Sequence, residues 1–310
     1  MKEYGTDSIR NVALVGHLGS GKTSLVEAML YNTGATTRLG KVEDGTTVSD
    51  FDEEEQRSKI TVSTSLVAVE FDNYKINILD TPGFTDFVGE VKSALRVADA
   101  AIIVVDAVAG VEVGTELVWQ YCDEFKLPRF VVINKMDREN ANFQRALESV
   151  KALSRGVKLV PVQLPWGEKQ DFKGVIGILS MKGRKGAKGE IVDIPAEHKD
   201  AAQKAHVAMM EAAAEGEDEL LEKYLGGEEL TNDEIKHGFK RAVDNGTFVP
   251  VFVASVTGNV AIVPILEGIT RYMPSPTEIP VLHGECKGGD EVVAVSDTGA
   301  LSAYVFKTTA

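Results

Sequence analysis

Cysteine is scarce in this chain: only Cys122 and Cys286 occur among its 310 residues, and they lie far apart. This excludes a disulfide framework and a cysteine-rich metal site, and it favours a reduced, cytoplasmic compartment. Long apolar runs are missing as well, because no stretch approaches the roughly 20 residues that a membrane-spanning helix requires. The opening residues MKEYGTDSIR contain no apolar core of a secretory signal. We therefore expect a cytoplasmic protein without membrane contact.

Positive charge is in the minority, with 33 Lys and Arg residues against 47 Asp and Glu residues and a net charge of −14. A negative surface disfavours non-specific binding to nucleic acid, whose phosphates require basic partners. The one basic cluster, Lys182 to Lys188, is interrupted by glycine and is interpreted as a solvated turn, with RNA contact as the alternative. The acidic run Asp52 to Glu55 is interpreted as a solvated face. We expect a monomer that does not recognise a nucleic-acid sequence.

The segment GHLGSGKT, Gly16 to Thr23, follows a buried apolar run over 12–15 and precedes a helical pattern that begins at Leu25. This order of strand, glycine-rich loop and helix is the context in which the motif G-x-x-x-x-G-K-[ST] binds phosphate. A glycine-rich turn that binds nothing is the alternative, and the flanking elements argue against it.

The residue types in this loop fit the chemistry of phosphate binding. Gly16, Gly19 and Gly21 allow successive backbone N–H groups to turn inward at the positive end of the following helix. Lys22 carries a charge to the outer phosphates, and the hydroxyl of Thr23 is a ligand for Mg2+. The loop therefore predicts a nucleotide phosphate site.

A second motif, Asp80-Thr81-Pro82-Gly83, comes directly after a predicted strand over 75–79. Asp80 can hold water bound to Mg2+, and the Gly83 N–H can meet a terminal phosphate and release when that phosphate leaves. An isolated turn led by Pro82 is the alternative. Its place after a strand of a phosphate-loop protein favours the functional interpretation.

A third motif, Asn134-Lys135-Met136-Asp137, follows a buried run over 130–133. The Asp137 carboxylate can accept two N–H bonds from guanine, whereas adenine offers no matching pair of donors. Lys135 can cover the purine with its stem, and Asn134 can connect the base loop to the phosphate loop. A polar turn after a strand is the alternative.

Three further residues are weaker candidates. Ser255 follows a predicted strand over 249–254 and could close the base site through loop N–H groups. Thr61 lies where a long loop over 33–59 meets a strand, so that it could reach Mg2+ and the terminal phosphate, although an ordinary strand-initiating Thr is the alternative. His17 is interpreted as a structural residue without a catalytic role.

Alternating buried strands and amphipathic helices predict a doubly wound, mostly parallel sheet with helices on both faces. The expected strands cover 62–71, 75–79, 100–105, 130–133, 160–164, 175–181, 249–254, 292–295 and 301–306. The expected helices cover 87–98, 113–125, 142–153, 197–215, 218–224, 232–245 and 263–272.

The alternation is interrupted in the middle of the chain, which indicates an insertion. We expect a nucleotide domain over 1–156 and 248–276, with an inserted α+β subdomain over 157–247. Residues 273–276 and Pro280 form a stiff exit linker. Residues 277–310 are expected to contain the rest of this linker and the start of a truncated β-barrel domain.

With these motifs in hand, nearly the whole chain resembles the beginning of the elongation factor G family, the ribosomal translocation GTPases. The similarity includes GHLGSGKT, EEEQRSKIT, DTPGFTDF, NKMD, the block from Pro161 to Gly183, RYMPSP and YVFKTTA. Tetracycline-resistance ribosome protection proteins fit less well because they lack the inserted block, and peptide chain release factor three is a nearer rival.

The resemblance implies a P-loop GTPase fold, GTP or GDP with Mg2+ as ligands, and the ribosome as partner and activator. It also implies later domains beyond residue 310. Catalysis is expected from Lys22, Thr61 and Gly83, and metal binding from Thr23, Thr61 and Asp80. Nucleotide contacts are expected from Gly16, His17, Leu18, Gly19, Ser20, Gly21, Lys22, Thr23, Ser24, Asp80, Gly83, Asn134, Lys135, Asp137, Ser255 and Val256.

Two departures from the family pattern indicate a divergent paralogue. Phe84 stands where the family usually has the histidine that positions the attacking water, and Phe84 has neither a donor nor an acceptor. Gly19 stands where the family usually has Asp, which changes loop rigidity or monovalent-ion binding. The leading hypothesis is a GTP-hydrolysing switch. A guanine-nucleotide-binding module with little turnover and an ATP-using phosphate-loop enzyme are the alternatives.

Overall fold

A computed structural model describes residues 2–154, 156–279, 282–286, 289–296, 298–299 and 301–308. Its centre is a seven-stranded sheet in the order β2-β3-β1-β4-β5-β11-β6. The strands are β1 Ile9–Val15, β2 Ser65–Phe71, β3 Tyr74–Asp80, β4 Ala100–Asp106, β5 Arg129–Asn134, β6 Lys158–Pro161 and β11 Phe248–Val253. Only the edge pair of β2 and β3 is antiparallel, and the other neighbours run parallel. The predicted α/β class with a doubly wound, mostly parallel sheet is confirmed.

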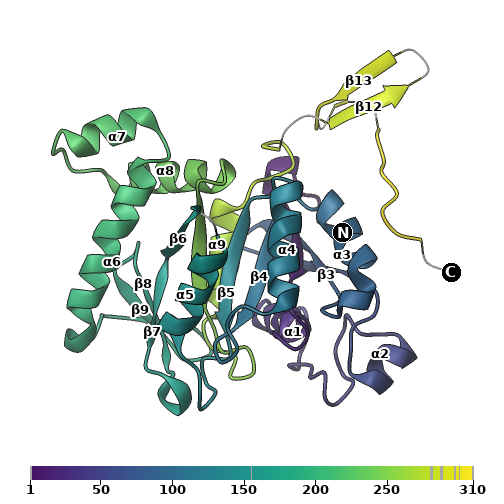
Figure 1. Cartoon of the computed structure of the whole chain (residues 1–310), viewed down its shortest axis with the longest axis horizontal. Helices are drawn as coiled ribbons and strands as arrows, with labels where there is room; N and C mark the ends of the chain where they lie inside the picture. Colours follow the sequence, from purple (N-terminus) through teal and green to yellow (C-terminus); the bar gives the residue numbers. More distant parts are fainter. Residues whose placement is uncertain are drawn as a thin grey trace.

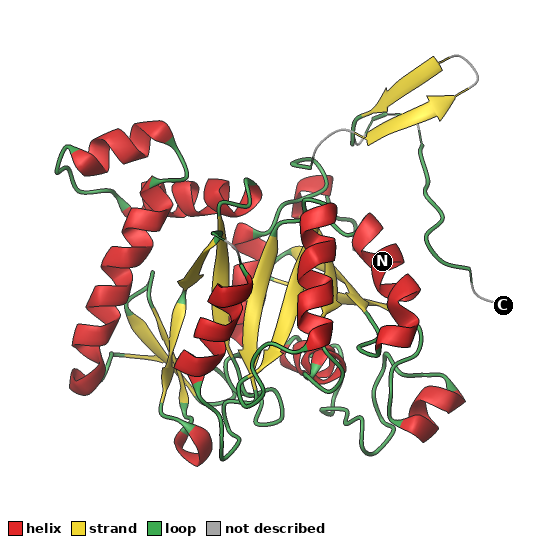
Figure 2. Cartoon of the chain, in the orientation of Figure 1, coloured by secondary structure: helices red, strands yellow, loops and turns green. Residues whose placement is uncertain are grey.

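Helices cover both faces of this sheet (Figures 1 and 2). Alternate residues of β1 enter different cores: Val12 and Leu14 pack with one face, Ala13 and Val15 with the other. The first core includes residues of α1 Lys22–Asn32 and α9 Ile262–Tyr272, and the second includes residues of α3 Val88–Val97, α4 Val113–Glu124 and α5 Phe143–Leu153. Because β4 and β5 are buried on both faces, their sequences are continuously apolar.

The inserted block lies between β6 and β11 of the chain. It has a second, four-stranded antiparallel sheet in the order β10-β9-β8-β7 and three helices. Its elements are β7 Gln163–Trp166, β8 Gly174–Gly177, β9 Lys182–Lys185, β10 Glu190–Val192, α6 Ala196–Ala214, α7 Asp218–Leu225 and α8 Asn232–Asp244. The three helices agree with the predicted helical stretches within one residue at each end.

Three predictions in this block were wrong in detail. The strand expected over 175–181 ends at Gly177, because residues 178–181 form the turn that leads into β9. The strand expected over 160–164 is two strands, because Val162 lies at a junction where its N–H bonds to Val251 of the main sheet and its carbonyl accepts from Ile178 of the insertion. The basic cluster is not a turn throughout: Lys182–Lys185 forms β9, a central strand of the small sheet. Pairing on both sides, with β8 and β10, holds the strand despite its glycine and charges.

The long loop over 33–59 contains a six-residue helix, α2 Glu53–Ser58. Asp52 caps it, with its side chain and that of Glu55 forming a capping box. The acidic run is therefore not simply solvated, because Glu55 is only 1% exposed and accepts hydrogen bonds from Val62 N and Ser63 N. The expected strand over 62–71 accordingly begins only at Ser65.

Beyond α9 the described residues form a small antiparallel pair, β12 Leu282–Cys286 and β13 Gly289–Val293, which projects away from the main sheet (Figure 1). β13 overlaps the strand expected over 292–295. Residues 301–308 have no strand assignment, so the strand expected over 301–306 was wrong. Pro280 of the expected linker lies outside the described residues, and the β-barrel stays a prediction.

The remaining short elements are the 3-10 helices Thr6–Ser8, Thr85–Phe87 and Lys169–Asp171. Among the described residues, no helix has both the length and the apolar character needed to cross a membrane.

Candidate functional site

The phosphate loop joins the end of β1 to the start of α1, and two of its glycines are required by close packing. Gly16 has φ of 147°, and a Cβ atom there would lie 2.5 Å from the carbonyl oxygen of Val104. Gly21 has φ of 101°, and a Cβ atom there would overlap with Nδ2 of Asn134. Larger residues would be strained at both positions and would push the loop off its neighbours. Gly19 also has positive φ but has open space around it.

Lys22 begins α1 and turns its side chain back into the loop. Its Nζ donates to the carbonyl oxygens of Gly16 and His17, at 3.1 Å each. Burial lowers the pKa of Lys22 to about 8, while the nearby carboxylates of Asp80 and Asp50 act in the opposite direction. A buried ammonium group whose hydrogen-bond partners are neutral carbonyls is well suited to bind an anionic phosphate.

A cluster of hydroxyl and carboxyl groups lies beside Lys22. The Oγ1 atoms of Thr23 and Thr61 are 3.1 Å apart, and Thr61 Oγ1 donates to Asp50 Oδ1 at 2.8 Å. Ser49 Oγ donates to Asp80 Oδ2 at 2.9 Å. The predicted metal ligands Thr23 and Thr61 are thus joined to Asp50, and the third, Asp80, is joined to Ser49, which directly precedes Asp50. Neither Ser49 nor Asp50 was predicted as a site residue.

The Asp80 carboxyl has the properties expected of a site for a hard cation. Burial raises its pKa to about 6, against the lowering effect of the hydrogen bond from Ser49 and of the Lys22 charge. Its Oδ1 atom is buried and has no hydrogen-bond partner among the described residues. An orphaned carboxylate oxygen near threonine hydroxyls fits Mg2+, which prefers oxygen ligands.

Two buried carboxylates hold the long loop against this cluster. Glu27 of α1 is buried, and its Oε1 accepts from Val48 N at 2.6 Å, directly before Ser49. Glu55 fixes the stretch after Thr61 in the same manner, through Val62 and Ser63. The capping pattern Asp52-x-x-Glu55 can be recognised in the sequence and indicates a helix in this loop. No pattern in the sequence indicates the contact of Glu27 with Val48.

Gly83 lies directly against the phosphate loop. A Cβ atom there would overlap with Lys22 Nζ and would lie 2.7 Å from Leu18 Cα. The next residue, Phe84, is 39% exposed, with its ring 6.1 Å from that of Phe87. The loop after β3 therefore reaches Lys22 through its backbone, and Phe84 contributes no polar group beside it.

Replacing Gly83 by alanine is expected to weaken GTP binding by about tenfold or more, because the added methyl group displaces either Lys22 or the loop backbone. Titration with a fluorescent, non-hydrolysable GTP analogue measures the effect. Gly89→Ala is the matched control, because its Cβ would meet no atom within 4 Å. Equal affinities of the two variants would contradict the close packing of Gly83.

His17 connects the phosphate loop to the start of α4. Its Nδ1 accepts from Gly114 N at 3.2 Å, and its Nε2 lies 3.4 Å from Glu112 Oε1. These contacts fit the structural role expected of His17.

Asn134 connects the three loops of the base side. Its Nδ2 donates to the Ser20 carbonyl oxygen at 2.9 Å, and its Oδ1 accepts from Val256 N at 3.1 Å. Asp137 Oδ1 accepts from Ser255 Oγ at 2.7 Å, and Oδ2 accepts from the Thr257 hydroxyl at 3.3 Å. The loop after β5 is thus bonded to the phosphate loop and to the loop after β11.

Lys135 is held by an unexpected partner, since its Nζ lies 2.6 Å from Asp106 Oδ2 at the end of β4. Hydrogen bonds and the charge of Lys135 lower the pKa of the Asp106 carboxyl, against the opposing effect of burial. Asp106 and Thr257 follow buried strands just as the predicted residues do, so their places at strand ends were the signal that could have found them.

The structure therefore brings the predicted motifs together at the carboxyl ends of the parallel strands. Leu18 is partly exposed. Ser20 contacts the loop after β5 through its carbonyl oxygen, which accepts from Asn134, and its hydroxyl is buried without a hydrogen-bond partner among the described residues. Ser24 is half-buried, and no hydrogen bond of its side chain is found within the described part of the chain. No predicted site residue lies in the inserted block.

Comparison with known proteins identifies related sequences and structures. Residues 7–275 match the family described as "Elongation factor Tu GTP binding domain". Elongation factor G of Fervidobacterium nodosum is 39% identical over 308 residues, which cover 97% of this chain and 44% of that protein. A crystal structure of a protein from Thermus thermophilus matches with a TM-score of 0.84 and 39% identity, over 91% of this chain and 43% of the other. The chain thus spans less than half the length of these relatives.

Proposed function

Because this chain belongs to the family of elongation factor Tu GTP-binding domains and is similar to elongation factor G, we propose that it binds GTP and GDP with Mg2+ and hydrolyses GTP. The observation that carries the proposal is the pair of hydrogen bonds made by Asn134. They connect the loop of Asp137 to the phosphate loop of Lys22 and to the loop of Val256. The base that Asp137 would select and the phosphates that Lys22 would bind can therefore belong to the same nucleotide.

In this proposal water attacks the γ-phosphate, and fixed positive groups stabilise the charge that develops there. Lys22 supplies the buried cation, and the Gly83 N–H donates to the terminal phosphate. Mg2+, which Thr23, Thr61 and Asp80 would hold, neutralises phosphate charge when bound. Thr61 also senses the terminal phosphate, so GTP would order the segments 33–61 and 83–87 and hydrolysis would release them.

We further propose that the protein works as a monomer in the cytoplasm, with the ribosome as partner and activator. The similarity to elongation factor G supports this proposal. The division into a nucleotide domain, an inserted subdomain and a barrel start after 276 is proposed on the same ground, with the expected start of the insertion at residue 157 moved to the residue after Pro161. We assign β6 to the nucleotide domain because it pairs with β11.

A second candidate function is a guanine-nucleotide-binding module with little turnover. Phe84 favours it, since an aromatic hydrocarbon cannot orient a water molecule. Loss of a positioned acid or base typically lowers an enzymatic rate by about 10²- to 10⁴-fold.

Single-turnover GTP hydrolysis by the wild-type chain and by Phe84→His tests the two candidates. If the chain is an enzyme that orients water by another route, the wild type forms GDP and the histidine variant differs by less than about tenfold. The assay is run with Mg2+, with and without ribosomes, and Lys22→Ala provides the blank. A wild-type rate equal to that of the Lys22→Ala blank, together with a Phe84→His rate about a hundredfold or more above this blank, would favour the second candidate.

A further inference from the structure

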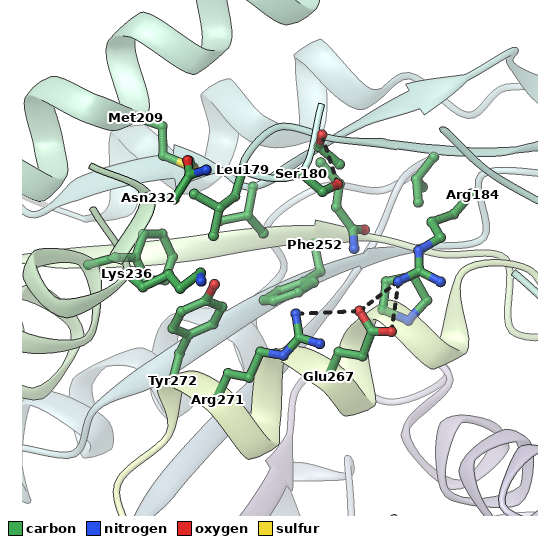
Figure 3. A pocket seen from close by; sticks show the side chains of 17 residues that line it. Leu179, Ser180, Arg184, Met209, Asn232, Lys236, Phe252, Glu267, Arg271 and Tyr272 are labelled. Carbon is green, nitrogen blue, oxygen red and sulfur yellow. Dashed lines mark hydrogen bonds and ion pairs between the residues drawn. The ribbon is translucent and has the colours of Figure 1, made fainter. Parts of the chain in front are cut away.

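A cavity of about 280 Å³ lies where the inserted block meets the nucleotide domain, away from the loops described above. It opens between α9, β11 and the insertion elements β7, β8, β9, α6 and α8 (Figure 3). None of its described lining residues belongs to the phosphate loop, the loops after β3 and β5, or residues 255–257. The proposed GTPase activity therefore makes no use of this cavity.

One wall of the cavity is apolar and largely aromatic. Phe239 and Phe252 are buried, and the Phe239 ring lies 4.5 Å from the ring of Tyr272. Met209 and Val175 add aliphatic surface from the insertion. Burial raises the pKa of Tyr272 to about 12, so its phenol remains a neutral hydrogen-bond donor. Such a wall suits the flat face of an aromatic ligand.

The lining of the cavity also carries more positive than negative charge. Arg184, Lys236 and Arg271 line the cavity, and Glu267 is the only carboxylate among its described lining residues. Arg184 holds both oxygens of Glu267, at 2.8 and 3.1 Å, whereas Arg271 Nη1 lies 3.9 Å from Glu267 Oε2. Figure 3 shows both arginines turned toward this carboxylate. Because Glu267 is already bound by Arg184, the Arg271 guanidinium remains available to a second carboxylate.

A deeply placed polar group also faces the cavity. Gln163 is only 4% exposed, and its Oε1 accepts from Val253 N at 3.4 Å. Its amide nitrogen has no acceptor among the described residues, although the side chain lines the cavity. This amide group can donate a hydrogen bond to a ligand in the cavity.

We propose that this cavity binds a small aromatic carboxylate. The aromatic body lies on Phe252 and Tyr272, and the carboxylate is bound by Arg271 with Lys236 beside it. The cavity is slightly smaller than the range of about 300–1,000 Å³ that drug-sized ligands occupy, so the ligand has roughly a dozen non-hydrogen atoms.

The probe is 2-naphthoate, titrated by isothermal calorimetry and by ligand-observed NMR into the chain saturated with Mg2+ and GDP. Saturation prevents the probe from occupying the phosphate loop. The expected dissociation constant is of order 1 mM or tighter, given the few atoms of the probe. The uncharged 2-naphthamide is expected to bind at least about tenfold more weakly, because it cannot form the charged pair.

Variants assign the binding to this cavity. Arg271→Gln and Lys236→Gln are expected to weaken 2-naphthoate binding, by about tenfold for Arg271 and less for Lys236, which is also held by Asp233 at 2.8 Å. Ser180→Trp, at an exposed lining position, is expected to abolish binding by filling the opening. Arg241→Gln is the matched control, because Arg241 is exposed on α8 but does not line the cavity.

All variants change exposed residues, and retained GDP binding with a native circular dichroism spectrum verifies their fold. The titration is repeated without GDP. Binding of 2-naphthoate is expected to depend on Arg271 in the same way whether or not the nucleotide is present. The proposal is overturned if the wild type shows no binding at a 2-naphthoate concentration about ten times the expected dissociation constant. It is equally overturned if Arg271→Gln and Ser180→Trp bind as the wild type does, or if 2-naphthamide binds equally well.

Discussion

A Lys22→Ala variant of this chain is expected to bind GTP and GDP roughly thirtyfold to several thousandfold more weakly than the wild type. The range corresponds to the loss of about 2–5 kcal/mol when one partner of a buried charge pair is removed. Lys22 is buried, and its ammonium group donates to the carbonyls of Gly16 and His17 at the place where phosphate oxygens are proposed to lie. No other lysine or arginine side chain bonds to these two carbonyls in the described part of the chain.

The variant is expected to remain folded. Burial disfavours the charged form of Lys22, as its lowered pKa of about 8 indicates, so removal of the ammonium group relieves a desolvation cost. Affinity is measured by titration with a fluorescent GDP derivative, and thermal unfolding verifies the fold. Lys204→Ala, an exposed residue of α6, is the matched control. An affinity of Lys22→Ala equal to that of the wild type would rule out the proposed phosphate site.

The second large effect is expected for Asp137→Asn, which should reverse the choice of base. Guanine presents two N–H donors to a carboxylate, whereas xanthine has a carbonyl oxygen in place of the amino group. The carboxamide of the variant would present one acceptor and one donor, which match xanthine and leave a guanine donor facing another donor. We expect GDP affinity to fall by about a hundredfold, or about 3 kcal/mol, and xanthosine diphosphate to bind better than GDP.

Competition between the two nucleotides measures this preference, and ADP is included to exclude general loss of selectivity. Both oxygens of Asp137 accept hydroxyl hydrogen bonds, from Ser255 and Thr257, so the amide nitrogen of the variant loses one of them. Asp218→Asn, on the exposed start of α7, controls for the change in net charge. Unchanged preference for GDP in Asp137→Asn would show that another residue selects the base.

Much of the fold followed from local patterns. The apolar runs of β4 and β5 and the amphipathic α5, α8 and α9 have lengths and periods that a single sequence displays. The start of β2 and the course of residues 33–61 did not follow in this way. There the conformation depends on Glu27 and Glu55, and a charged side chain gives no sign in the sequence that it will be buried against distant backbone N–H groups.

The candidate site was also predictable wherever all the residues that the loop requires lie within one short motif. Gly21 and Lys22 can be recognised because the loop needs a glycine of positive φ and a lysine at that spacing. The contact of Lys135 with Asp106 joins the ends of two strands whose distance in space depends on sheet order. No motif records that order.

By itself, the sequence determined the chemistry of the loops, because phosphate and base recognition require particular residue types at fixed local spacing. It also determined which segments alternate as strand and helix. Only the tertiary structure decided that β6 belongs to the main sheet, that the basic segment Lys182–Lys185 is a central strand, and that Arg184 of the insertion binds Glu267 of α9. These arrangements arise from contacts between residues far apart in the chain, whose energies depend on packing that no local pattern specifies.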